Sequence, residues 1–265
     1  MPEQLTYLMH IPKTAGMSLQ KIVRKRYKLD RELFLVYDKT ARKQGFKDDE
    51  SLKVVMGHFP YGYHQFSKRT PRYFTFLRNP KEHFISNYFY FKEHPDKYPN
   101  LDASTTLEDF ATNGPGYNFQ TRYVSGILKI KGREQEALDL AKKNLTESIQ
   151  CIGLTEKFDQ SLLMMGKALG WKNFFYQKAN EGKKRKQHPP ISKADWETIS
   201  NANRYDEELY TFAQNLFEVQ KKRYPSIERE TRIFKLKNDL FWKINPLYTR
   251  LKVALGLEKI PIARR

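Results

Sequence analysis

The chain has 265 residues, of which 39% are hydrophobic, so it is long enough for one α/β domain with additions. Its 48 lysines and arginines outnumber its 30 aspartates and glutamates, and the formal charge of +18 attracts anions without determining the fold. Cys151 is the single cysteine, which excludes an intramolecular disulfide, and the sequence has no run of about 20 apolar residues of the kind that spans a membrane.

The first elements along the chain frame a loop that suits an anion. Leu5 to Met9 predicts a buried strand and Ser18 to Tyr27 a helix, with a short loop around Lys13 and Gly16 between them. Backbone N–H groups at a helix N-terminus point at an anion, and the Lys13 ammonium adds positive charge. The order differs from a nucleotide-triphosphate loop, which ends in Gly-Lys-Ser/Thr and holds Mg²⁺. The alternative is an ordinary turn, in which Gly16 only supplies backbone freedom and Lys13 is solvated.

A second strand end supplies an arginine. Val54–Met56 and Arg72–Leu77 predict two further strands, and Pro80–Lys92 predicts a helix because proline suits the first helical turn. Arg78 is therefore expected at the carboxyl end of a buried strand, where open α/β sheets bind ligands. Ser86 lies one to two turns into the helix and can face the same crevice. A guanidinium fork and a hydroxyl together suit a phosphate.

The rest of the chain alternates strands and helices, which predicts an α/β fold with a mostly parallel central sheet flanked by helices. The stretch from His94 to Thr105 is expected to be a loop over one end of the sheet that gates an acceptor. The segment Gly116–Ser125 carries Asn118, Gln120 and Arg122 and is too polar to be wholly buried. Further strands are expected at Gln150–Leu154 and near Asn173–Tyr176, and further helices at Leu107–Thr112, Gly116–Ser125, Glu134–Asn144, Lys157–Leu169, Lys193–Ser200 and Asp206–Arg223.

Two of these segments together resemble a known family. His10 to Leu19, and Phe76 through Arg78 to Tyr88, resemble the two cofactor signatures of carbohydrate sulfotransferases. The closest group is sulfotransferase family 2, which includes heparan sulfate 2-O-sulfotransferases. The resemblance implies a sulfotransferase fold of the P-loop nucleotide-hydrolase type that uses 3′-phosphoadenosine 5′-phosphosulfate (PAPS), releases 3′-phosphoadenosine 5′-phosphate (PAP) and needs no metal. Weaker matches extend over most of the chain, at Gly57–Phe59, Tyr117–Arg122, Ile152–Phe158 and Tyr205–Tyr210.

The resemblance also implies roles for individual residues. Lys13 is expected to stabilise negative charge on the transferred group, and His58, ahead of His10 and His64, to take the proton of the acceptor hydroxyl. Arg78 and Ser86 are expected to hold the 3′-phosphate of the cofactor. The remaining expected contacts are the backbone amides of Thr14, Ala15, Gly16, Met17 and Ser18 on the 5′-phosphate, and the basic run Lys184, Arg185 and Lys186 closing over the 3′-phosphate. The alternative for that run is a solvated stretch of charge.

The end of the chain is expected to differ from the rest. Residues 1–225 are predicted to form the sulfotransferase domain, and residues 226–265 a basic, partly amphipathic helical extension interrupted at Pro246. The extension is expected to pack across the core, with a peripheral membrane surface or a partner as the alternatives. Its helical stripe consists of Phe234, Lys237, Phe241, Ile244, Tyr248 and Leu251. With no spanning segment and a first strand near residue 5, we expect a soluble, cytoplasmic protein of bacterial type.

The expected reaction is in-line transfer of the sulfuryl group from PAPS to an acceptor hydroxyl. The expected acceptor is a carbohydrate, and the expected partner besides PAPS is therefore a glycan or another anionic molecule. One alternative is a P-loop nucleotide kinase or hydrolase, which would depend on Mg²⁺. Another is a non-enzymatic polyanion-binding protein, whose binding would fall steeply with salt. None of the usual nucleic-acid-binding motifs is evident, so no specific nucleic-acid partner is expected.

Overall fold

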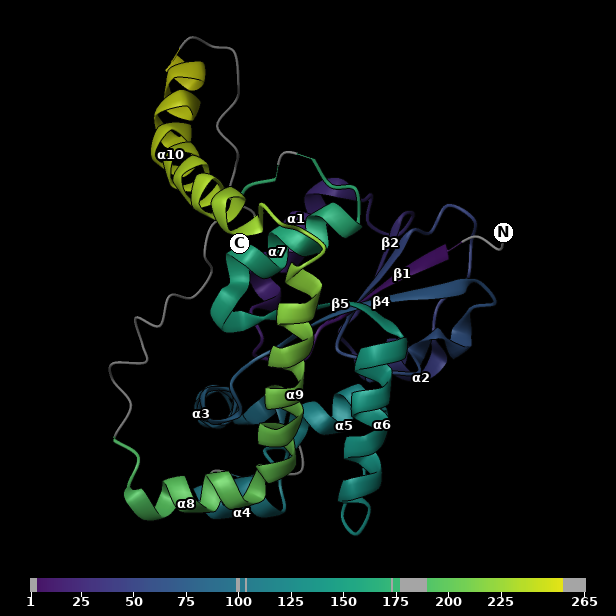
Figure 1. Ribbon diagram of the computed structural model, residues 1–265, viewed down its shortest axis with the longest axis vertical. Helices are drawn as coiled ribbons and strands as arrows, with labels where there is room; N and C mark the ends of the chain where they lie inside the picture. Colours follow the sequence, from purple (N-terminus) through teal and green to yellow (C-terminus); the bar gives the residue numbers. More distant parts are fainter. Residues whose placement is uncertain (1–3, 99–100, 103, 173, 177–189, 255–265) are drawn as a thin grey trace.

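A computed structural model describes residues 4–98, 101–102, 104–172, 174–176 and 190–254, the last ten of these by their backbone only. Its centre is a sheet of five parallel strands in the order β2-β3-β1-β4-β5 (Figure 1). The predicted α/β class with a parallel central sheet is therefore confirmed. The strands are β1 (Gln4–Met9), β2 (Leu33–Val36), β3 (Val54–Gly57), β4 (Thr70–Leu77) and β5 (Ile149–Leu154).

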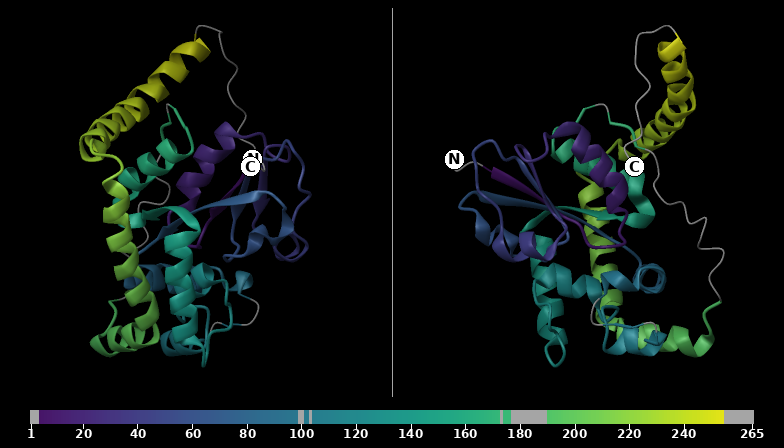
Figure 2. Two further views of the ribbon diagram at one scale, coloured as in Figure 1. Left: turned by 45° about the vertical axis from the view of Figure 1, so that its right-hand side comes forward. Right: turned by 180° about the vertical axis from the view of Figure 1, so that it is seen from behind.

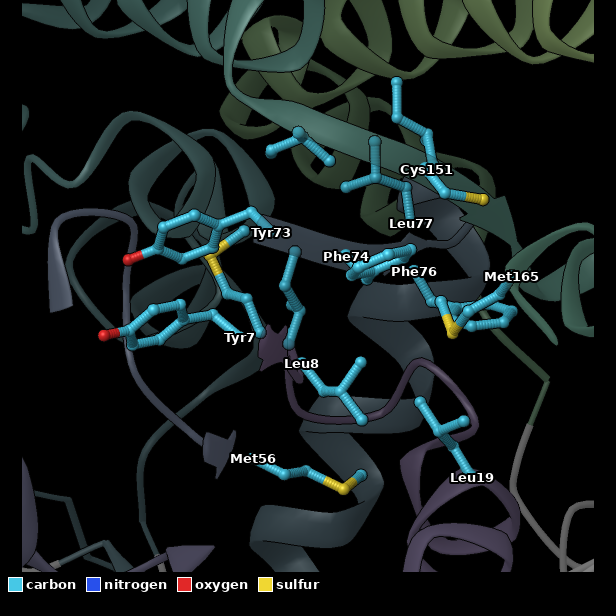
Figure 3. Close-up of a cluster of buried hydrophobic side chains, with 14 of the residues drawn as sticks. Tyr7, Leu8, Leu19, Met56, Tyr73, Phe74, Phe76, Leu77, Cys151 and Met165 are labelled. Carbon is cyan, nitrogen blue, oxygen red and sulfur yellow. The ribbon is translucent and has the colours of Figure 1, made fainter. Parts of the chain in front are cut away.

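The strands are buried on both faces, which explains why they are nearly continuous apolar runs rather than alternating ones. In β1 every residue from Leu5 to Met9 is buried. Tyr7 stacks on Tyr73 of β4 with ring centroids 4.9 Å apart, while Leu19 of α1 and Met165 of α7 reach the same core cluster (Figure 3). The core thus fixes β1 between its two neighbours and fixes where its carboxyl end lies.

Helices cover both faces of this sheet. Helices α1 and α7 lie on one side, and α5 and α6 on the other (Figures 1 and 2). A second apolar cluster, built around Phe84, Phe91 and Phe110, joins α3, α4 and α8 below the sheet. The helices are α1 (Gly16–Arg26), α2 (Lys39–Gln44), α3 (Pro80–Glu93), α4 (Leu107–Thr112), α5 (Phe119–Ser125), α6 (Glu134–Glu147), α7 (Phe158–Ala168), α8 (Lys193–Ala202), α9 (Arg204–Lys221) and α10 (Ile227–Ala254), with short 3₁₀ turns η1 (Tyr63–Phe66), η2 (Pro95–Lys97) and η3 (Thr155–Lys157).

Two short elements, β2 and α2, were not predicted from the sequence, and one predicted strand is absent from the described residues. Strand β2 has only four residues and α2 only six, too few for a clear periodic pattern. Residues 174–176, where a strand was expected, are irregular. Phe174 and Tyr176 instead pack on Phe234 of α10, with ring centroids 5.5 and 6.3 Å apart. Their apolar character serves a helix contact and not a sheet.

Helix α10 begins at Ile227, close to the expected start of the extension. Its first half joins the main core through Ile227 and Phe234, and Asn238 accepts a 2.8 Å hydrogen bond from the Tyr176 amide. Its outer half projects from the rest of the molecule (Figures 1 and 2), and Ile244 there is 51% exposed. The backbone stays helical through Pro246, so the expected interruption is wrong. A proline removes one hydrogen bond but does not always end a long helix.

In the part of the chain that the structure describes, no helix combines the length and the apolar character that crossing a lipid bilayer requires.

Candidate functional site

The loop between β1 and α1 has the backbone shape of an anion cradle. Lys13 and Ala15 both adopt left-handed conformations, with φ of 70° and 63°. Such residues cost of order 1–3 kcal/mol each and persist where the surrounding structure imposes them. The amides of Thr14 and Ser18 already donate to Ile11 and Ala15 carbonyls at 3.3 and 3.2 Å. The Ala15 and Gly16 amides donate to no described residue, and the N-cap has no side-chain bond, so these two N–H groups are the ones available to an anion.

Position 16 requires a glycine because there is no room for a Cβ atom, and not because of its φ angle. A Cβ atom at this position would lie 1.8 Å from Nε2 of His10, because the imidazole lies directly against the first turn of α1. The left-handed conformations of this loop lie at Lys13 and Ala15 and not at Gly16. Close approach of His10 to the backbone therefore determines how the loop enters the helix.

Arg78 lies at the carboxyl end of β4, beside that loop. Its Nη1 donates a 3.1 Å hydrogen bond to the Lys13 carbonyl, and its Nη2 lies 3.5 Å from the Glu82 carboxylate. Gln120 of α5 fixes its backbone from both sides, accepting from the Arg78 amide at 2.9 Å and donating to its carbonyl at 2.7 Å. The ends of β1 and β4 thus form one site, as the strand order requires.

The Lys13 ammonium lies over an aromatic ring of α3. Its Nζ is 4.1 Å from the centroid of Tyr90, a cation–π contact, and it has no hydrogen bond or ion pair with any described residue. Burial, and then the nearby Arg78 charge, lower the pKa of Lys13 to about 8. Two cations held close together at a partly buried edge favour the binding of an anion, because an anion would relieve their repulsion.

Helix α3 presents one face to this loop. His83 is buried and its Nε2 donates to the Pro12 carbonyl at 2.8 Å, while burial lowers the pKa of the imidazole to about 4. Ser86 follows three residues later and Tyr90 four after that, so all three share the face on the loop side. Ser86 is half-buried. The spacing thus places its hydroxyl on the side of the helix where the cations lie.

Histidines gather at the end of the neighbouring strand β3. The His58 ring lies 4.7 Å from the His10 ring and 4.7 Å from the Tyr37 ring, measured between centroids. Burial lowers the pKa of His58 to about 4 and that of His10 well below its usual value, so both are neutral at pH 7. Both ring nitrogens of His10 are buried without a partner among the described residues. His64 is already engaged, with Nδ1 3.0 Å from the Tyr73 hydroxyl.

A buried carboxylate supports the arginine from a distance. Asp206 of α9 accepts bonds from the Gln120 amide at 3.0 Å and from the Thr121 amide and hydroxyl at 2.7 Å each, at the N-terminus of α5. Burial raises the pKa of Asp206, and these donors oppose that shift. Asn118, Gln120 and Thr121 are buried, whereas Tyr117 and Arg122 keep part of their surface exposed, so the segment is not wholly buried, as its polarity predicted. Asp206 satisfies the polar groups that would otherwise have kept α5 in solvent.

Some of the expected site residues cannot be assigned to this site from their side chains. Lys184, Arg185 and Lys186 lie outside the described residues. The Met17 side chain is 51% exposed, so only its backbone points to a role. Tyr90 and Asp206 were not among the predicted site residues. The position of Tyr90, four residues after Ser86 on one helix, is a signal that could have identified it. Among the described residues, no group of three or more His, Cys, Asp or Glu side chains is arranged to hold a metal ion.

Fold and geometry together define an α/β protein with a candidate anion-binding site at the carboxyl ends of β1 and β4. No protein-family model matches the chain, and no curated protein matches it. Mouse sulfotransferase SULT7A1, in a crystal structure with PAP, aligns with 14% identity and a TM-score of 0.43 over 77% of this chain and 66% of its own, just under two thirds. A sulfotransferase from Alicyclobacillus acidocaldarius aligns with 11% identity and a TM-score of 0.44 over 82% of this chain and 97% of its own. With TM-scores below 0.5 these likenesses carry no argument about ligands or chemistry.

Proposed function

We propose that the protein transfers the sulfuryl group of PAPS to an acceptor hydroxyl. The observation that carries this proposal is the hydrogen bond from Arg78 Nη1 to the Lys13 carbonyl, 3.1 Å long. It joins the loop after β1 and the end of β4 into one cationic site, close enough for a single nucleotide to contact both. The sequence motifs at these two strand ends are those that resemble the sulfotransferase signatures.

The residues of the site fit the two charged ends of PAPS. The turn from Thr14 to Ser18 would hold the 5′-phosphosulfate, with the Ala15 and Gly16 amides as the available donors. Arg78 and Ser86 would hold the 3′-phosphate, because Arg78 directly precedes α3 and the spacing along that helix puts Ser86 on the side of the β1 loop. Lys13 supplies the side-chain positive charge of the loop. This assignment separates PAPS from ATP, which lacks a 3′-phosphate.

In the proposed reaction, residues of the site account for the proton and for the charge on the leaving group. The acceptor oxygen forms a bond to sulfur while the bond from sulfur to the 5′-phosphate oxygen breaks, and the hydroxyl proton passes to His58. Lys13 stabilises the charge that develops on the leaving oxygen. His58 is neutral at pH 7, so it can accept a proton, and general-base help of this kind contributes about 10²–10⁴-fold. His10 is the less favourable base because both of its ring nitrogens are buried.

A thermal-shift comparison of PAP, AMP and ATP with Mg²⁺ tests the cofactor. We expect PAP to raise the melting temperature most, since it alone combines 5′- and 3′-phosphates, and we expect Arg78→Gln to reduce that difference. Stronger stabilisation by ATP with Mg²⁺ would support a nucleotide kinase instead. Equal, salt-sensitive stabilisation by all three and by heparin would support a polyanion-binding protein.

The base is tested separately from the cofactor. His58→Ala should keep the PAP shift within error and lower turnover by about 10²-fold or more. In the wild-type enzyme, kcat/KM should stay high as the pH falls until about pH 4, where His58 of the free enzyme takes up its proton. Full activity of His58→Ala, together with loss of activity in His10→Ala, would transfer the role to His10.

A further inference from the structure

Helix α10 carries two apolar rows, and only one of them meets the rest of the molecule. Ile227 and Phe234 lie in the main core. Roughly 100° further around the helix, a second row of apolar side chains lies in solvent. Its members recur at spacings of three and four residues, which keeps them on one side of the helix. We call this row the exposed stripe, and it consists of Ile233, Leu236, Leu240 and Ile244, with exposed fractions of 39, 71, 56 and 51%.

The exposed stripe leads outward along a helix that projects from the domain. Helix α10 has 28 residues, and its outer half stands clear of the sheet and its covering helices (Figure 2). Single apolar side chains on a surface are ordinary, but several in one row mark an interaction surface. The same spacing continues in the sequence at Leu247 and Leu251. The stripe is therefore a long apolar edge that the described part of the chain does not cover.

Positive charge flanks the exposed stripe on both sides. At 3.6 residues per turn, Lys237 lies on one side of it and Lys243 on the other, and both side chains are exposed. Residues 231–254 contain six lysines and arginines and a single acid, Asp239. Glu228 and Glu230, nearer the start of the helix, are paired with lysines of α9 and α7 at 3.0 and 2.8 Å. The projecting part of α10 thus combines an apolar edge with a net positive charge.

The surface of an anionic bilayer matches this combination. A helix with an apolar edge and basic flanks lies in the plane of the interface, with its apolar side about 5–10 Å deep among the lipids. Each cation close to an anionic bilayer raises the affinity by about fivefold. The charge of +18 on the whole chain adds attraction over a longer range. The helix would lie on the bilayer, since no described helix is suited to cross one.

A second copy of the chain suits the exposed stripe less well. Two stripes packed on each other would bring Lys237 and Lys243 of both copies to the edges of one seam. Paired helices normally place opposite charges beside such a seam, and this segment has only Asp239 to offer. Like charges there would oppose pairing. An anionic lipid surface, by contrast, accepts the apolar edge and the cations together.

We propose that α10 docks the protein on an anionic lipid bilayer. The exposed stripe enters the boundary between headgroups and acyl chains, and Lys237 and Lys243 lie at the lipid phosphates. The proposal is independent of the proposed function, because none of these residues belongs to the site at the ends of β1 and β4. It gives the protein a location at a membrane surface, whatever reaction it performs there.

Co-sedimentation of the full-length chain with vesicles tests the apolar contact. We expect binding to phosphatidylcholine vesicles that contain about 30% phosphatidylglycerol to be at least about tenfold tighter than to phosphatidylcholine alone. The double variant Leu240→Asp/Ile244→Asp should weaken binding to the anionic vesicles by at least about tenfold. Val219→Asp is the control, because that side chain is 52% exposed but lies on α9, and it should bind within about twofold of the wild type.

A charge-matched pair of variants tests the basic flanks. Lys237→Gln/Lys243→Gln should weaken binding to the anionic vesicles by at least about tenfold, since two cations leave the lipid surface. Lys21→Gln/Lys143→Gln removes the same charge from exposed positions on α1 and α6 and should change binding by no more than about twofold. Equal losses in the two variants would assign the attraction to the overall charge and overturn the docking by α10.

A dye attached to the stripe locates the contact. Cys151 is buried, with 4% of its surface exposed, so an environment-sensitive thiol-reactive dye on the folded variant Ile244→Cys reports on that position. Its emission should shift to the blue on anionic vesicles, and the emission of the dye on Val219→Cys should not. Vesicle binding without a blue shift at Ile244→Cys would place the contact elsewhere and overturn the proposal.

Three further results would overturn it: no preference for anionic over neutral vesicles, retained binding in Leu240→Asp/Ile244→Asp, or a dimer in sedimentation velocity that this variant dissociates and vesicles do not. The last result would assign the stripe to a second copy of the chain. If Leu240→Asp/Ile244→Asp does not fold, Lys237→Gln/Lys243→Gln must lose binding instead. Stabilisation by PAP should be the same in all these variants, so failure of the docking leaves the proposed function standing, and the reverse also holds.

Discussion

The two strand ends that form the site are held in different ways. The loop after β1 depends on its own backbone, with left-handed residues at Lys13 and Ala15 and an imidazole packed against Gly16. The end of β4 depends on side chains from distant elements, since Gln120 fixes Arg78 and Asp206 fixes the helix that carries Gln120. One half of the site is therefore local in sequence, and the other half is a product of packing.

This difference has a functional consequence. The β1 loop carries a charge that can respond to its surroundings, because Lys13 is held by a ring contact and has a lowered pKa. The β4 end offers a guanidinium that stays charged, on a backbone fixed by two hydrogen bonds. Substitutions in the loop should therefore alter catalysis and pH dependence, while substitutions in the support of β4 should alter stability first.

The largest effect is expected from Lys13→Ala. Removing one preorganised charge from a transferring group typically lowers kcat by about 10²–10³-fold. The melting temperature should not fall, because the substitution also removes a partly buried cation that Arg78 repels. Rates of PAP formation and thermal unfolding measure the two effects. Lys21→Ala on the exposed side of α1 is the control, and comparable losses in both variants would contradict a specific role for Lys13.

Next in size is the loss of stability in Asp206→Ala. Three donors of α5 would remain buried without an acceptor, and we expect the free energy of unfolding to fall by about 3 kcal/mol or more. Chemical denaturation measures this. Glu208→Ala is the matched control, because that carboxylate is 56% exposed in a surface pair with Lys142 and should cost less than about 1 kcal/mol. Similar losses in both variants would show that Asp206 does not support α5.

A smaller effect is expected from Gly16→Ala. The new methyl group would overlap the His10 ring, so the loop must shift, at a cost of about 1–3 kcal/mol in the free energy of unfolding and with weaker PAP binding. Denaturation and PAP titration give the two numbers. The double variant Gly16→Ala/His10→Ala should recover most of the stability because the obstacle is gone. A double variant no more stable than Gly16→Ala would indicate that the glycine is needed for another reason.

The smallest expected effect is the pH dependence of PAP affinity. A bound anion favours protonated Lys13, so affinity should be constant below the free-state pKa of about 8 and should fall as the pH rises above it, up to about tenfold by about pH 9. Isothermal titration calorimetry in buffers of different ionisation enthalpy would also detect proton uptake on binding. Lys13→Arg should bind PAP with little pH dependence over this range, and an unchanged decline in that variant would assign the titration to another group.

Much of the fold could be predicted from the sequence because parallel strands are buried on both faces. Their apolar runs, followed by helical periodicity, gave β1, β3, β4 and β5 and most of the helices. The short elements β2 and α2 were not predicted. A strand was wrongly predicted at Phe174 and Tyr176, because an apolar run does not show whether it packs on a sheet or on a helix.

The sequence by itself determined the loop around Lys13, the strand end at Arg78 and their order along the chain, because each is a run of adjacent residues whose chemistry follows from local periodicity. Only the tertiary structure decided that Gly16 makes room for His10, that Asp206 holds α5 and that Gln120 fixes Arg78. Those contacts join residues far apart in the chain, and whether a polar side chain is satisfied depends on partners that packing brings to it.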